Sequence, residues 1–66
     1  MNLNEASEAR AIASAELDRT QAAFDRGGVS RDELNAARAK YQSALADEAT
    51  ARAILAALSG VVGSLP

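Results

Sequence analysis

The chain contains no cysteine, no histidine and no tryptophan, and its 66 residues include one proline, one phenylalanine and one tyrosine. Without cysteine there can be no disulfide and no thiol chemistry, and the absence of both cysteine and histidine excludes the common zinc sites. With so few aromatic rings, a surface that stacks nucleic-acid bases is not expected. The single proline is the last residue, so proline interrupts no helix.

Charge and length exclude further classes of protein. The net charge is −2 with both signs interspersed, which gives no basic footprint for nucleic acid. No run is apolar enough to predict a membrane span, and the N-terminal residues lack the pattern of a signal peptide. If Met1 is the native start, we expect a cytoplasmic protein. A chain of 66 residues is at most one small domain, near the lower limit for an independent core.

Alanine is abundant, at 17 positions, and it is both the best helix former and the side chain that lets helices approach closely. The sequence therefore predicts an all-α, antiparallel two-helix hairpin, with helices at about 3–26 and 30–59 and a turn at 27–29. Asn2, or Asn4 as an alternative, suits the first N-cap. Gly27 suits a left-handed helix terminator, and Ser30 with Glu33 forms a capping box for the second helix.

The C-terminal segment 60–66 differs from the helices. It is apolar and uncharged, and it contains two glycines. We expect the second helix to stop at Gly60, so that residues 1–59 form the hairpin and 60–66 a flexible tail. Docking of this tail on a partner is the alternative.

Apolar positions recur at alternating spacings of three and four along both helices, which is the pattern of a heptad seam. Folded about the Gly27 turn, the seam positions match in pairs whose residue numbers sum to 57 or 58. The seven predicted layers are Phe24–Leu34, Thr20–Ala37, Leu17–Tyr41, Ala13–Ala44, Arg10–Glu48, Ala6–Ala51 and Leu3–Leu55.

The Arg10–Glu48 layer is polar within an otherwise apolar seam. A buried pair between the helices would fix their register, as polar residues do in coiled coils. In the alternative, both side chains reach solvent and Glu48 pairs with Arg52 one turn further along the same helix.

A hairpin so rich in alanine buries little surface, and several aliphatic residues lie in or beside the seam where a second layer of helices could cover them. We therefore expect a homo-oligomer or docking on a helical protein partner. The candidate self-association residues are Ile12, Leu45, Ile54, Leu58, Val61 and Val62.

Catalysis is not expected. The carboxylates are spread over exposed faces, a helical di-metal site would need histidine, and a two-helix hairpin offers no cleft for a substrate. Gly27 and Gly28 do not form a phosphate-binding loop, because no strand precedes them and no lysine follows at the required place. The sequence predicts no catalytic residues, no metal site and no cofactor.

The segment from Glu16 to Ala37 resembles the α-helical hairpin of the periplasmic adaptor proteins, or membrane fusion proteins, of tripartite efflux and secretion systems. In that family the hairpin tip docks end-on with an outer-membrane channel protein, through an Arg, a Leu four residues later and a Ser seven residues after that. Arg19 and Ser30 match this motif, whereas Ala23 stands at the Leu position, with Phe24 beside it.

The resemblance covers roughly residues 10–58 and implies a periplasmic location if the chain is an excised hairpin. The tip residues that it implies are Arg19, Ala23, Phe24, Arg26, Ser30 and Arg31. The sequence as a whole predicts a non-enzymatic structural or interaction module. A subunit of a helical filament and a small cytoplasmic regulator that binds a client protein are the alternatives.

Overall fold

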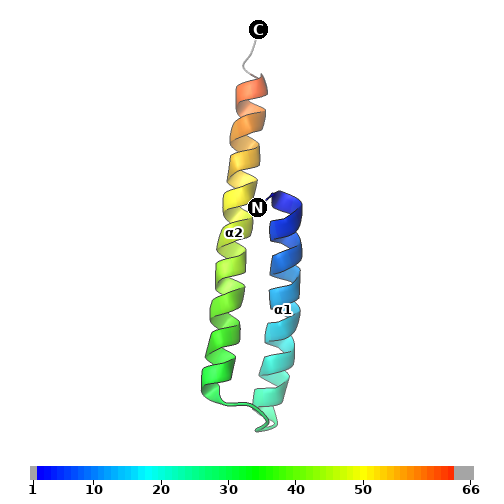
Figure 1. The fold of residues 1–66 in the computed structure, drawn as a ribbon, viewed down its shortest axis with the longest axis vertical. Helices are drawn as coiled ribbons and strands as arrows, with labels where there is room; N and C mark the ends of the chain where they lie inside the picture. Colours follow the sequence, from blue (N-terminus) through cyan, green and yellow to red (C-terminus); the bar gives the residue numbers. More distant parts are fainter. Residues whose placement is uncertain (1, 64–66) are drawn as a thin grey trace.

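A computed structural model of the chain consists of two antiparallel helices, α1 (Leu3–Asp25) and α2 (Arg31–Gly63), joined by a short turn (Figure 1). It describes residues 2–63, with side chains described for residues 2–60. No strand occurs among these residues. The predicted all-α helical hairpin is confirmed, and α1 ends one residue before the predicted boundary.

Each helix begins at a capping side chain. Asn2 precedes α1, where its Oδ1 atom accepts a hydrogen bond from the backbone N–H of Glu5 at 2.8 Å and its Nδ2 atom donates to the Glu5 carboxylate at 3.2 Å. Ser30 precedes α2, and its Oγ atom accepts from the backbone N–H of Glu33 at 3.1 Å. The bonds from the N–H groups of Glu5 and Glu33 satisfy backbone amides that the first turn of a helix leaves without an intrahelical partner.

The predicted end of α2 was wrong. The helix does not stop at Gly60 but runs on to Gly63, four residues beyond the predicted boundary at residue 59. A glycine ends a helix when it takes a left-handed conformation, and among the described residues Gly27 alone has a positive φ, of 75°. Much of the predicted tail is therefore helical, and residues 64–66 lie outside the described part of the chain.

The core follows the predicted seam. Among residues 2–60, whose side chains are described, six are buried and all six are seam positions: Ala6, Ala13, Leu34, Ala44, Glu48 and Ala51. Seven further seam residues are half-buried: Leu3, Arg10, Leu17, Thr20, Phe24, Ala37 and Tyr41. Because two helices can cover only one strip of each other, the core is a single narrow row of mostly small side chains.

The Leu3–Leu55 layer is incomplete. Leu3 is half-buried, but Leu55 remains 50% exposed. The physical reason is that α1 begins at Leu3, so no further turn of α1 covers Leu55 from above.

The molecule is a rod rather than a globule. Its radius of gyration is 16.5 Å, against about 11 Å for a compact domain of this length. Helix α2 has 33 residues and α1 has 23, and the upper part of α2 rises past the start of α1 (Figure 1). Counting from the layer at Leu55, residues 56–63 project beyond α1 by about 12 Å. We call residues 56–63 the overhang.

Candidate interaction surfaces

The turn is held by two backbone hydrogen bonds that close the end of α1. The N–H of Gly28 donates to the carbonyl of Ala23 at 2.8 Å, and the N–H of Gly27 donates to the carbonyl of Phe24 at 2.9 Å. Together with the left-handed Gly27, this pattern is a Schellman motif. The turn end of the hairpin therefore has a defined backbone, as the two glycines predict.

The predicted tip residues gather at this turn end. The guanidinium of Arg31 lies 5.5 Å from the centroid of the Phe24 ring, which is within the range of a cation–π interaction. Arg19, Arg26 and Arg31 are exposed near this end of the rod, and the acidic side chains of the same segment are exposed with them: Asp25, Asp32 and Glu33. The hydroxyl of Ser30 is engaged as the N-cap of α2.

Ala23, which stands where the adaptor motif has leucine, is half-buried and presents a methyl group. The position thus lacks the large aliphatic side chain that would project from it in the adaptor pattern. Phe24, the neighbouring residue, is also half-buried and lies beneath the Arg31 guanidinium.

The predicted polar layer joins the two helices. Arg10 Nε lies 3.0 Å from Glu48 Oε2, and the Arg10 side chain is 36% exposed while that of Glu48 is 11% exposed. The pKa of the Glu48 carboxyl is lowered, first by a hydrogen bond from the Ser7 side chain and then by the hydrogen bond from Arg10, with smaller contributions from the charges of Arg10 and Arg52. The ionised form of the carboxyl is thus favoured, although the other buried residues of the seam are all apolar. Its role in fixing the register stays a prediction.

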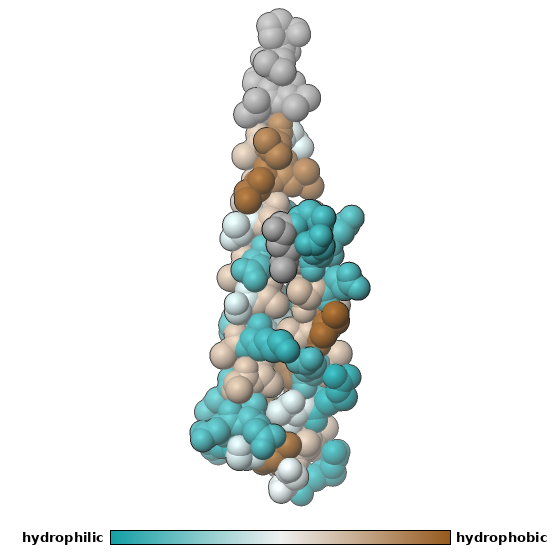
Figure 2. Space-filling model, in the orientation of Figure 1, coloured by the Kyte–Doolittle hydropathy of each residue, from teal (hydrophilic) through white to brown (hydrophobic). Residues whose placement is uncertain are grey.

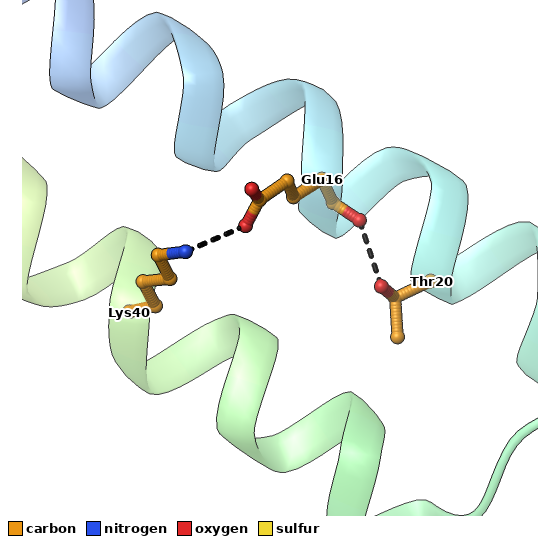
Figure 3. A network of polar contacts seen from close by, with 3 residues as sticks. All are labelled: Glu16, Thr20 and Lys40. Carbon is orange, nitrogen blue, oxygen red and sulfur yellow. Dashed lines mark hydrogen bonds and ion pairs between the residues drawn. The ribbon is translucent and has the colours of Figure 1, made fainter.

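Two further contacts between the helices were missed by the sequence analysis. Lys40 Nζ lies 2.9 Å from Glu16 Oε2 (Figure 3). Arg38 Nη2 donates to Gln21 Oε1 at 3.2 Å. The sequence did contain a signal for these contacts. The residue numbers of the two pairs sum to 56 and 59, next to the sums of 57 and 58 in the seam, so the paired residues lie at matching heights on the two helices beside the seam. Both contacts are exposed, and pairs of this kind contribute less than about 1 kcal/mol.

The C-terminal half of α2 exposes a cluster of large aliphatic side chains. Ile54 is 56% exposed, Leu55 50% and Leu58 59%. With Leu3 and Ala51 they line a shallow open groove of about 180 Å³ beside the start of α1. Figure 2 shows apolar surface on the part of α2 that extends beyond the start of α1. We call Leu3, Ile54, Leu55 and Leu58 the end patch.

The predicted self-association residues do not form one stripe. Ile12 on α1 is 53% exposed and lies at the height of the half-buried Leu45 on α2, near the middle of the rod. Ile54 and Leu58 lie about 14–20 Å further along α2 and belong to the end patch. Val61 and Val62 fall within α2, but their side chains lie outside the described part.

Within the described part of the chain, no group of three acidic, histidine or cysteine side chains is arranged to hold a metal ion. Over the same residues, neither helix has the length of apolar sequence that crossing a bilayer requires. Comparison of the chain with protein-family models, with curated proteins and with solved structures found no match. The structure thus defines a class, the antiparallel helical hairpin, with an exposed apolar patch near one end and exposed charges of both signs at the turn end.

Proposed function

We propose that the chain is a non-enzymatic helical interaction module that self-associates through the end patch. The observation that supports this is the clustering of three large aliphatic side chains, each at least half exposed, within two turns of α2. Single exposed aliphatic residues are ordinary on protein surfaces, whereas contiguous apolar patches mark interfaces.

The composition of the patch supports an apolar partner. Between Arg52 and the end of α2 the sequence has no charged residue, whereas charged residues occur throughout the rest of both helices. A second copy of the same segment would meet this surface without burying any charge, and burial of an unpaired charge is what most strongly opposes association.

The patch is small, which sets the expected affinity. Stable interfaces bury about 1,200–2,000 Å², and three aliphatic side chains on two helical turns fall below that class. We therefore expect a weak, reversible association, detectable from tens of micromolar to about 1 mM.

Sedimentation velocity over that concentration range tests the proposal with a matched pair of variants. Leu58→Gln and Ile12→Gln each replace an aliphatic side chain of similar exposure, 59% and 53%, with a polar side chain that supports a helix. We expect Leu58→Gln to abolish the concentration-dependent increase in sedimentation coefficient and Ile12→Gln to preserve it. Equal loss in both variants would reject the end patch as the interface.

The filament and client-binding alternatives predict different outcomes of the same series. A filament grows without limit, because its subunits join through two different surfaces, whereas a symmetric pair closes. A regulator of a client protein stays monomeric alone at every concentration and gains stability only when its client is added.

We also propose, as a second candidate, that the turn end docks on a partner protein, as the resemblance to periplasmic adaptors implies. The supporting observation is that Arg19, Arg26 and Arg31 are exposed at one end of the rod, with Arg31 stacked on Phe24. The implied partner is an outer-membrane channel protein that presents acidic or carbonyl groups to these guanidinium groups.

Binding of the hairpin to such a channel protein, measured by calorimetry, tests this second proposal. Arg19→Asp should weaken binding, and Arg52→Asp, which makes the same charge change on an exposed residue near the opposite end, should leave binding unchanged. Binding unaffected by Arg19→Asp would reject docking through the turn end.

A further inference from the structure

We infer that two copies of the chain join end to end, with the overhang of each α2 lying antiparallel beside the overhang of the other. In this arrangement the α2 helix of one copy continues the line of the other copy's α1. The inference rests on the proposed self-association and adds its geometry.

The first argument is the space beside the overhang. Helix α1 begins at Leu3, opposite Leu55, and the remaining residues of α2 have no helix of their own chain beside them (Figure 1). The vacant position is one helix wide and about 12 Å long. The overhang of a second copy has this same width and length, so two overhangs complete each other's helix pair.

The second argument is register. Continuing the three-and-four spacing of the seam from Leu55 gives positions 58 and 62 within α2. Positions 58 and 62 are symmetric about residue 60, so in an antiparallel pair each copy presents the same two positions to the other. In an antiparallel pair centred on residue 60, Leu58 of each copy therefore lies opposite position 62 of the other. A pattern that reads the same in both directions is what a twofold interface requires.

The third argument is electrostatic. In the end-to-end arrangement the C-terminus of one α2 points at the N-terminus of the other copy's α1. These helix ends carry opposite partial charges, so their dipoles align head to tail. The overhang itself carries no charge, so like charges are not brought together along the shared seam.

The exposed residues of the hairpin favour a side-by-side bundle of two complete hairpins less than they favour the end-to-end dimer. Away from the end patch, Ile12 is the large aliphatic residue that is more than half exposed among the described side chains. The outer faces there carry mostly alanine and charged residues, including the exposed Asp18, Arg38 and Asp47. A bundle of that kind would cover these charges and gain little apolar burial.

Distance measurement between spin labels separates the two geometries. The chain has no native cysteine, so a single label can be placed at the exposed Ser43 by Ser43→Cys. Ser43 lies 17 positions from the proposed centre, which places the two labels of an end-to-end dimer about 50 Å apart. Side-by-side hairpins would bring the labels within about 30 Å.

The labelled chain is measured at up to about 1 mM, with its mass determined in the same samples and with Leu58→Gln and Ile12→Gln added as second substitutions. A dimer with a distance near 50 Å, lost in Leu58→Gln and kept in Ile12→Gln, supports the inference. A dimer with a distance below about 30 Å overturns the end-to-end geometry and leaves self-association intact. A monomer at every concentration overturns both the geometry and the proposed function.

Discussion

Replacing Leu34 with alanine removes the large side chain that the hairpin buries most completely, since Leu34 is 2% exposed. Leu-to-Ala replacements in protein cores cost about 2–5 kcal/mol, and the lower half of that range applies to a two-helix seam, where neighbouring groups can relax into the gap. A loss of about 2–3 kcal/mol is large, because a chain of this length has a free energy of unfolding of only about 3–10 kcal/mol.

The melting temperature should fall by about 10–20 °C. It is measured by circular dichroism at a protein concentration of a few micromolar, where self-association is negligible. Leu55→Ala is the matched control, since Leu55 occupies the last seam layer but is 50% exposed. It should cost about 1 kcal/mol or less, because only half of its surface leaves water on folding. Equal effects of the two substitutions would refute the claim that the seam is buried at the turn end and open at the other.

Three further predictions concern single groups. Glu48→Gln should reduce the loss of stability of the hairpin in acid. The pKa of Glu48 is lowered from 4.5 in the folded chain, so its stabilising contribution is present above that value and is lost as pH falls through the folded pKa. Urea titrations at pH 7 and pH 3 should show a smaller difference in the free energy of unfolding between the two pH values for the variant than for the parent. Gly27→Ala should destabilise by about 1–2 kcal/mol in thermal melts, because φ is +75° at this position. Gly60→Ala should instead stabilise by about 0.5–1 kcal/mol, since Gly60 is helical and a methyl group there would meet nothing within 4 Å. Changes of the same sign at the two glycines would contradict these assignments.

Much of the hairpin was predictable because its determinants are local. The left-handed Gly27, the Ser30 cap and the Asn2 cap each depend on a few neighbouring residues. Once the turn is fixed, its position sets which residues face each other, so the pairing of Arg10 with Glu48 followed from counting outward from Gly27.

The end of α2 was not predictable in the same way. Gly60 carries a terminating signal in sequence, but a glycine within a helix costs only about 1 kcal/mol, and the flanking residues continue the helix through it. The exposure of Leu55 was also not predictable from the sequence. The spacing of the seam residues gives the helix face on which a residue lies, but it does not tell whether the other helix extends far enough to cover that residue. The end patch is a product of the unequal helix lengths, which only the folded hairpin displays.

The mass of the intact chain in solution, measured by light scattering from about 10 µM to 1 mM, tests the central claim most directly. Self-association through the end patch predicts a mass that rises from 6.8 kDa towards twice that value and then stops, because the twofold pair closes. A mass that stays at 6.8 kDa throughout, or one that grows past the dimer without limit, would contradict the account.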